Sequence, residues 1–215
     1  MQYLLSDLSI NVTEMFRDPE FFKKVRSEVA PILQTYPRVN IWHAGCATGE
    51  EVYSMAILLH EEDLLRRSQL YATDFNNMVL RKAKEGVYPI SAIKEYTANY
   101  QKSGGKASFS DYYTARYNSV LIHSLLKHNL VFAMHNLALD GPFAEAHMIV
   151  CRNVLIYFNR VLQNKVIGTF TESLLPGGIL CLGSKEDLQF SDHYRFFSTV
   201  DPVHKIYRKK YDITY

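Results

Sequence analysis

The stretch from Val39 to His60 combines an apolar run, two glycines and two acids in an order typical of a cofactor-binding turn. Gly45 and Gly49 separate the apolar run from a helical segment, and their missing β-carbons would let a ligand approach the backbone closely. The glycines follow G-x-x-x-G and not the dinucleotide fingerprint G-x-G-x-x-G. Glu50 and Glu51 come next, and acids at a helix start repel phosphate. This stretch therefore favours a ligand with hydroxyl groups or a positive charge.

A further acid, Asp74, ends the next apolar segment, residues 69–73. In α/β nucleotide-binding units, an acid at the tip of the second strand holds ribose hydroxyls. The spacing between the glycine turn and Asp74 predicts a cofactor that contains ribose. The alternative is that Asp74 only caps the helix that follows it.

The elements that must position these residues alternate between strand and helix. The patterns predict strands at 39–44, 69–73, 130–134, 148–151 and 179–182, helices from the glycine turn to about Glu62 and at 76–85 and 160–175, and a closing hairpin at 196–200 and 205–208. This order predicts an α/β fold of the Rossmann-like kind, a mostly parallel, doubly wound sheet with an antiparallel C-terminal hairpin. Ligands of such sheets bind at the carboxyl ends of the strands.

Two regions depart from this alternation. Residues 1–38 are interpreted as a helical lead-in that contributes to the site, with Asp18 as a cap and Pro19 opening a helix, and residues 39–215 as the main domain. At about 100–128, a Gly104-Gly105 turn and two β-rich stretches predict a small inserted antiparallel β-subdomain. Such insertions often recognise partners, although this one could also have no function.

Composition excludes several classes of function. With 24 basic and 22 acidic residues the net charge is only +2, so nucleic acid and membrane insertion are not expected. No apolar run reaches the roughly 18 residues of a membrane helix, and three scattered cysteines indicate reduced thiols, so a cytoplasmic protein is expected. The sequence contains no metal-ligand spacing, phosphate loop or Ser-His-acid pattern, which disfavours metalloenzymes, kinases and hydrolases.

The blocks NVTEMFRDP at 11–19, AGCATGEE at 44–51, ATD at 72–74, NL at 136–137, CRNVLIYF at 151–158, PGG at 176–178 and LGS at 182–184 run in a characteristic order. On these blocks the sequence resembles the CheR-type methyltransferases, which use S-adenosylmethionine to esterify glutamate side chains of bacterial chemoreceptors. The CRNVLIYF block is the most specific of them. The resemblance extends over most of the chain.

The resemblance implies a set of cofactor contacts, with S-adenosylhomocysteine as the product. Glu50 would lie near the methionyl part, Asp74 would bind the ribose hydroxyls, and Asn136 and Leu137 would flank the adenine. The full implied set is Asn11, Thr13, Arg17, Gly45, Glu50, Asp74, Asn136, Leu137, Arg152 and Asn153. A positively charged sulfonium cofactor without phosphate agrees with the acids of the glycine turn.

The resemblance also implies three catalytic residues: Arg17, Arg152 and Tyr157. A glutamate acceptor, with a pKa of about 4.3, is already ionised at neutral pH and needs no general base. Catalysis then consists of placing the carboxylate in line with the methyl group. The two arginines are expected to hold the acceptor carboxylate, since guanidinium binds carboxylate in a bidentate manner. Tyr157 would face the transferred methyl group.

Arg17 and Tyr157 each have a simpler interpretation. Arg17 could pair with Glu14 or Asp18 at the surface. Tyr157 could belong to the core. Cys151 has no histidine partner in the sequence and is not expected to be a nucleophile.

Departures from the family pattern leave the acceptor open. Family members begin with a small helical domain that helps to dock the receptor, and this sequence starts too close to the first block to contain one. The expected partner is the cytoplasmic domain of a chemoreceptor or a related signalling protein, and residues 107–122 could pair with a tethering peptide. The alternatives are a methyltransferase with another acceptor, or a non-catalytic protein that senses the cofactor or its product.

Overall fold

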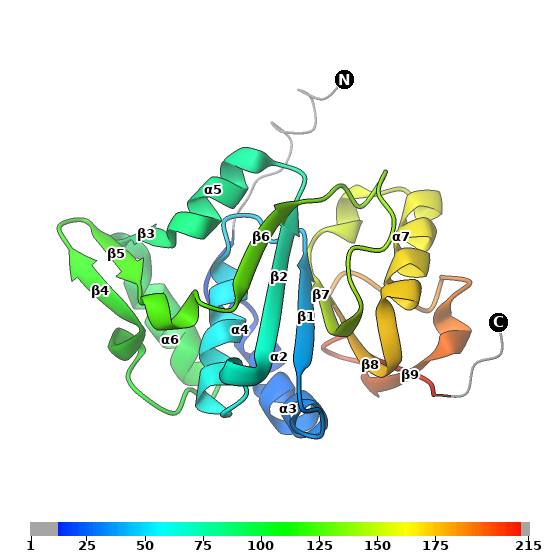
Figure 1. Ribbon diagram of the computed structural model, residues 1–215, viewed down its shortest axis with the longest axis horizontal. Coiled ribbons are helices and arrows are strands. Elements are labelled where there is room, and N and C mark those ends of the chain that lie inside the picture. The colour runs from blue at the N-terminus through cyan, green and yellow to red at the C-terminus, as the bar shows by residue number, and fades with distance from the viewer. Residues whose placement is uncertain (1–12, 212–215) are drawn as a thin grey trace.

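The computed structural model describes residues 13–211, and a central sheet dominates it (Figure 1). Within these residues the sheet has seven strands in the order β6-β2-β1-β7-β8-β10-β9. Their bounds are Leu130–Met134, Ser68–Asp74, Val39–Ala44, Ala146–Cys151, Leu174–Leu182, Ile206–Lys209 and Phe197–Asp201, respectively. The first five pair in parallel, whereas β10 is antiparallel to both of its neighbours. The predicted sheet, including its antiparallel C-terminal hairpin, is therefore confirmed.

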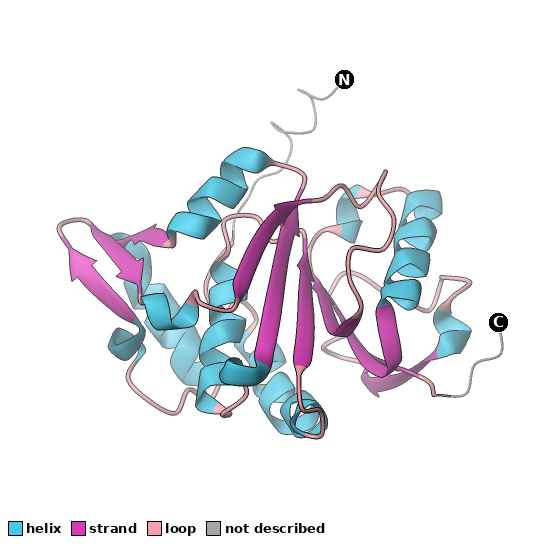
Figure 2. Ribbon diagram, in the orientation of Figure 1, coloured by secondary structure: helices cyan, strands magenta, loops and turns pink. Residues whose placement is uncertain are grey.

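Helices cover both faces of this sheet (Figure 2). Alternate residues of β1 point to opposite faces, as the two-residue period of a strand requires. Ile41 lies in a core with α4 (Glu50–Glu61), and Trp42 lies in a second core with α7 (Arg160–Ser173). The sheet therefore separates two apolar layers, and its strand ends remain as the place for polar groups.

The N-terminal helix is continuous but changes pitch. It consists of α2 (Pro19–Lys24), a π-helical turn at Val25–Val29, and α3 (Ala30–Gln34). Pro19 opens the helix, as predicted. The predicted side-chain cap is wrong: Asp18 has a left-handed backbone with φ of 57° and makes no capping hydrogen bond with its side chain. Its carboxylate points to a different partner, described below.

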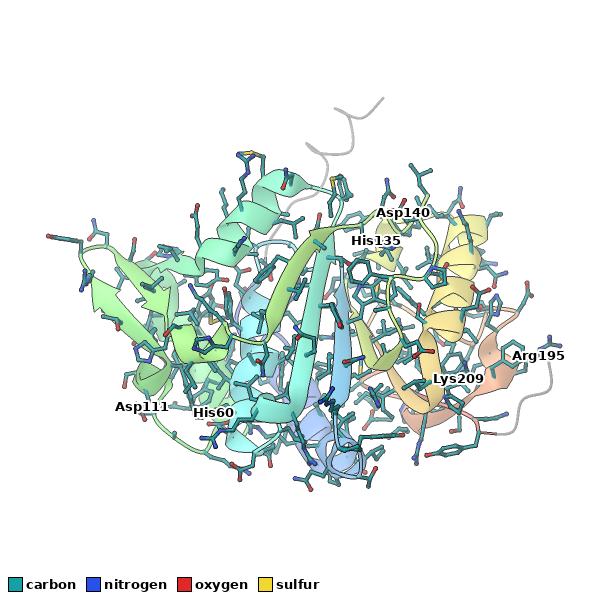
Figure 3. The ribbon with its side chains drawn as sticks, in the orientation of Figure 1. His60, Asp111, His135, Asp140, Arg195 and Lys209 are labelled. Atoms are coloured by element: carbon teal, nitrogen blue, oxygen red, sulfur yellow. The ribbon has the colours of Figure 1, made fainter. Side chains whose placement is uncertain are left out.

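Two boundaries in the second half of the sheet differ from the prediction. Helix α7 ends at Ser173, and β8 already begins at Leu174. The segment Pro176 to Gly178, between the predicted helix and the predicted strand, lies inside β8, where the register with β7 shifts. At the end of β10, the Lys209 ammonium donates to the carbonyls of Thr171 and Leu174 and so closes the end of α7 (Figure 3).

A small antiparallel sheet lies beside the main one. Its strands are β3 (Val87–Pro89), β5 (Ser119–Ile122) and β4 (Tyr113–Arg116), in that order, and α6 (Ile93–Lys102) connects β3 to the rest. The antiparallel insertion is confirmed, but its first strand precedes the predicted range. Residues Phe109–Tyr112, predicted as strand, form a 3-10 turn because Ser108 and Asp111 make a capping box.

The remaining elements are short. Helix α5 spans Asn77–Glu85, and further 3-10 turns lie at Leu65–Arg67, Ile90–Ala92, Ser124–Leu126, Leu155–Tyr157 and Tyr194–Phe196. In the described part of the chain, no helix is both long enough and apolar enough to span a bilayer.

The buried Glu61 carboxylate joins the small sheet to the main domain. It pairs with Arg26 of the N-terminal helix and accepts hydrogen bonds from the hydroxyls of Tyr100 and Tyr112 and from the backbone N–H of Lys106. These partners outweigh burial and lower the pKa of Glu61. One carboxylate at the end of α4 thus fixes three segments that are distant in sequence.

Candidate active site

The glycine turn between β1 and α4 is folded tightly against its neighbours. Gly45 has φ of 82° and Gly49 has φ of 90°, a region that favours glycine. A β-carbon on Gly45 would lie 2.6 Å from a methyl of Val154, and one on Gly49 would lie 2.9 Å from the β-carbon of Ala83. The packing of the turn itself therefore requires glycine at both positions, and the approach of a ligand to their backbone stays a prediction.

Asp74, at the end of β2, braces this turn. One carboxylate oxygen accepts the N–H of Ala47 at 3.0 Å, and the other accepts the N–H of Asn76 at 2.9 Å. Burial raises the pKa of Asp74, and backbone hydrogen bonds offset part of that rise. The helix cap is Asn76, whose side chain accepts the N–H of Met78, so the interpretation of Asp74 as a mere cap is wrong. Since a carboxylate can accept about four hydrogen bonds, Asp74 keeps the capacity to accept one from a hydroxyl group.

Glu50 is a buried acid without a cation. Only 5% of the residue is exposed, and the Thr48 hydroxyl donates to its carboxylate at 2.7 Å. Among the described residues no ion pair involves Glu50. Burial raises its pKa to about 7. A positively charged ligand group placed here would favour the ionised form.

Glu51, the next residue, is in the opposite situation. Its two oxygens lie 3.2 Å from His43 Nδ1 and 3.2 Å from Arg152 Nη1. Burial acts to raise its pKa, but His43 and Arg152 outweigh burial and lower it. The two acids of the glycine turn therefore differ. Glu51 is already paired within the protein, and only Glu50 remains available to a cationic ligand.

Arg152 follows β7 and connects three elements. Its Nη2 lies 2.5 Å from the Asp18 carboxylate, its Nη1 contacts Glu51, and its guanidinium carbon lies 4.0 Å from the centre of the Phe21 ring. The side chain is 3% exposed, and its buried Nε has no hydrogen-bond partner among residues 13–211. The Asp18 side chain, by contrast, is 44% exposed. The guanidinium thus holds α2, α4 and β7 together and keeps one unused donor.

A cleft of about 310 Å³ reaches Arg152 from the surface. Its walls come from the start of α2, the end of β8 and the turn between β9 and β10: Asp18, Pro19, Glu20, Phe21, Arg152, Ser184, Val203 and His204. Arg17 directly precedes this wall and is half-buried. Arg152, one of the two arginines expected to hold an acceptor, therefore lines a cleft that opens to the surface.

The segment after Arg152 is organised by Glu186, which the sequence analysis missed. Its buried carboxylate accepts the backbone N–H groups of Gly183, Asn153, Val154 and Leu155 at 2.5 to 3.1 Å. Asn153 takes a left-handed conformation with φ of 60° at this point. The only sequence signal was an acid three residues after the glycine that follows β8, which by itself is not specific.

The end of β6 adds two predicted residues. The N–H of His135 donates to the Asp74 carbonyl at 3.1 Å, which brings this segment to Asp74. Asn136 accepts the N–H of Ala138 through its side chain and donates its own N–H to Asp140, and Leu137 is buried in the α7 core. Figure 3 labels His135 and Asp140 at this edge of the sheet.

The other predicted residues are placed as follows. Tyr157 is 58% exposed, so the alternative that it belongs to the core is wrong. Thr13 is half-buried near the start of the described chain, whereas Asn11 lies outside the described residues. Burial raises the pKa of the Cys151 thiol, which disfavours the reactive thiolate form. The described residues contain no cluster of side chains that could hold a metal ion.

The carboxyl edge of the sheet thus combines an unpaired buried acid, an acid suited to hydroxyl groups, and a guanidinium at a cleft. A family model described as "CheR methyltransferase, SAM binding domain" matches residues 11–203. A Pseudomonas putida protein named "Putative methyltransferase Cher3" is 50% identical over 96% of this chain and 76% of its own length. The chemotaxis protein methyltransferase of Salmonella typhimurium is 30% identical over 92% of this chain and 67% of its own.

A solved structure supports the fold alone. The N-methyltransferase NodS of Bradyrhizobium japonicum, in complex with S-adenosylhomocysteine, is 14% identical, with a TM-score of 0.52 and 97% of both chains covered. Since the family model covers most of the chain, this protein belongs to the CheR methyltransferase family and carries its S-adenosylmethionine-binding domain.

Proposed function

We propose that this methyltransferase esterifies glutamate side chains of a chemoreceptor or a related signalling protein. The observation that carries the proposal is the contrast within one edge of the sheet: Glu50 is buried without a cation, while Arg152 lies at a cleft. Glu50 suits a cationic cofactor. Arg152 is paired with Asp18 and Glu51, but its Nε–H has no partner among the described residues and could serve an anionic acceptor. Relatives named chemotaxis protein methyltransferase support the choice of acceptor.

The chain's residues fit the cofactor in charge and in hydrogen-bonding capacity. S-adenosylmethionine, when bound, supplies a methyl group on a positively charged sulfur. In the proposal Glu50 faces the cationic methionyl part and Asp74 accepts the ribose hydroxyls. The other proposed cofactor contacts are Asn11, Thr13, Arg17, Gly45, Asn136, Leu137, Arg152 and Asn153.

The chain's own part in the transfer is to bind, orient and exclude water. The acceptor carboxylate is ionised at neutral pH, so no side chain has to remove a proton. Arg17 and Arg152 hold it, and the unpartnered Nε–H of Arg152 is a donor available for that task. Exposed Tyr157 bounds the path of the methyl group. Removal of water and correct placement supply the rate.

Because the receptor domain in question is cytoplasmic, the proposal also places this chain in the cytoplasm. A labelled-methyl assay with cytoplasmic fragments of chemoreceptors tests the proposal. Wild-type protein is expected to form methyl esters that are released by base. Arg17→Ala should abolish transfer and change cofactor affinity by less than about threefold, while Arg38→Ala, an exposed arginine away from the site, should behave as wild type.

Two outcomes contradict the proposal. Intact cofactor binding with no ester on any carboxylate acceptor would favour a sensor of the cofactor, or an enzyme with another acceptor. A collapse of cofactor affinity in Arg17→Ala would show that Arg17 serves the cofactor and not the acceptor.

A further inference from the structure

An exposed apolar patch lies beside the candidate site, around the start of α7. We name it the α7 patch, formed by Ile156, Tyr157, Arg160, Val161 and Phe190. The four apolar members are 42%, 58%, 82% and 80% exposed, in chain order. An apolar patch with charged groups at its edge is typical of an interaction surface. Tyr157 belongs both to this patch and to the proposed path of the methyl group.

The patch is held in place by hydrogen bonds beneath it. The Gln163 amide donates to the carbonyls of Leu155 and Phe158 at 2.9 Å, which fixes the turn that carries Tyr157 to the first turns of α7. Asn164 accepts from the Ser191 hydroxyl and from the N–H of Asp192, which fixes the loop that carries Phe190 to the same helix.

These hydrogen bonds bring the two apolar segments together on one face. Arg160 and Val161 lie four and three residues before Asn164, so all three share a side of α7. The guanidinium of Arg160 lies 5.7 Å from the centre of the Phe190 ring, which confirms the contact between the segments. The patch is therefore a preformed surface made of two segments that are distant in sequence.

Arg160 of the α7 patch and Lys185, on the loop that leads to Phe190, are the two cations considered as contacts for a partner. Neither Arg160 nor the exposed Lys185, next to Glu186, forms an ion pair within residues 13–211. Of the neighbouring acids, Asp187 pairs with Lys205, whereas Asp192 accepts a hydrogen bond from the neutral Asn164 amide and keeps its negative charge. A segment that covers the patch would thus meet apolar side chains and the guanidinium of Arg160, with Lys185 on the loop that leads to Phe190.

We infer that the α7 patch docks an acidic, amphipathic segment of the methyl-accepting protein and presents its glutamate to the site past Tyr157. This inference rests on the proposed function for the identity of the acceptor. The partner's apolar side chains would cover Val161 and Phe190, and its acids would pair with Arg160 and Lys185. The patch then determines which protein carboxylates are methylated, while the residues at the strand ends carry out the transfer.

Charge substitutions on the patch test this inference without disturbing the fold. Arg160→Glu and Val161→Asp place acids in the first turn of a helix, where they agree with the helix dipole. Leu125→Asp is the matched control, because Leu125 is 53% exposed on a 3-10 turn outside the α7 patch. Two quantities are measured: binding of a chemoreceptor cytoplasmic fragment to protein saturated with S-adenosylhomocysteine, and steady-state methyl transfer to the same fragment.

Arg160→Glu and Val161→Asp are each expected to raise the Kd and KM for the fragment by about tenfold or more. Their kcat and their affinity for the cofactor should stay within about twofold of wild type, and Leu125→Asp should change none of these. Fragment binding by Arg160→Glu and Val161→Asp that equals that of wild type would overturn the inference.

The two readouts separate this inference from the proposed function. If wild type binds the fragment without forming esters and the patch variants bind it more weakly, the docking surface stands and the proposed chemistry fails. If wild type forms esters and the patch variants do so with unchanged KM, only the docking surface fails. If wild type neither binds nor methylates any fragment, both fail.

Discussion

Glu50 and Glu51, the two acids that open α4, are adjacent in sequence but have opposite electrostatic surroundings. Glu50 is buried with a single hydroxyl donor and has its pKa raised to about 7 by burial. Glu51 is held between His43 and Arg152, which lower its pKa. Glu50 therefore lacks a positive charge nearby among the described residues, whereas the charge of Glu51 is already balanced.

This difference suggests that the two halves of the site are prepared in different ways. Around Arg152 the ion pairs with Asp18 and Glu51 are already formed in the folded protein. Ionised Glu50 is unfavourable in the free protein because it is buried. A cation bound beside it would stabilise the ionised form, so this position favours a cationic ligand. Three predictions test the contrast, from the largest expected effect to the smallest.

Breaking the paired side should be the most costly change. Arg152→Met leaves the half-buried Glu51 without this cation and releases the exposed Asp18, so the free energy of unfolding should fall by about 2–4 kcal/mol. Urea denaturation followed by circular dichroism measures this. Arg38→Met, at an exposed position, should change it by less than about 0.5 kcal/mol. A loss of less than about 1 kcal/mol in Arg152→Met would show that the ion pairs are not a structural unit.

Neutralising the unpaired side should have the opposite sign. Because the folded pKa of Glu50 is raised to about 7 from 4.5, the folded state takes up a proton, and stability falls as pH rises through that interval. Glu50→Gln removes this penalty, so at pH 8 the variant should be more stable than wild type by about 1–3 kcal/mol. At pH 4 the difference should vanish. A variant less stable than wild type at pH 8 would contradict an unpaired Glu50.

Supplying the missing cation should give the smallest effect. Both S-adenosylmethionine and S-adenosylhomocysteine carry an ammonium group, and the proposed function has this group face ionised Glu50. Below pH 7 their affinity should fall by up to about tenfold per pH unit, and above pH 8 it should level off. Titration calorimetry at several pH values measures this, with Glu50→Gln as the variant expected to bind more weakly and without this pH dependence. An equal slope in both proteins would place the ammonium group elsewhere.

The sequence predicted the strand ends well because local patterns define them. The apolar run of β1, the glycine turn and the start of α4 at Glu50 are all local features, and the structure confirms them. The pairing of Glu51 with Arg152 could not be predicted, since the two residues are 101 positions apart and either could have faced solvent. Glu186 was missed for the same reason, because three of its four backbone partners are 31 to 33 residues away. Whether each predicted site residue contacts the cofactor stays a prediction.

The small sheet shows a similar limit of local patterns. The three residues of β3 are too few to give a periodic signal, and only their pairing with β5 makes them a strand. In contrast, Phe109 to Tyr112 are strong β-formers that a local capping box diverts into a 3-10 turn.

Helix α4 limits how the small sheet of this protein can be exchanged for that of another family member. Its first turn holds Glu50 and Glu51 at the site, and its last turn holds Glu61, which fixes α6 and the turn before β4 through Tyr100 and Tyr112. The small sheet is therefore not an interchangeable surface loop. A chimaera that receives another member's small sheet must receive the matching hydroxyl donors as well, or it leaves a buried carboxylate unsatisfied at the far end of the helix that shapes the cofactor turn.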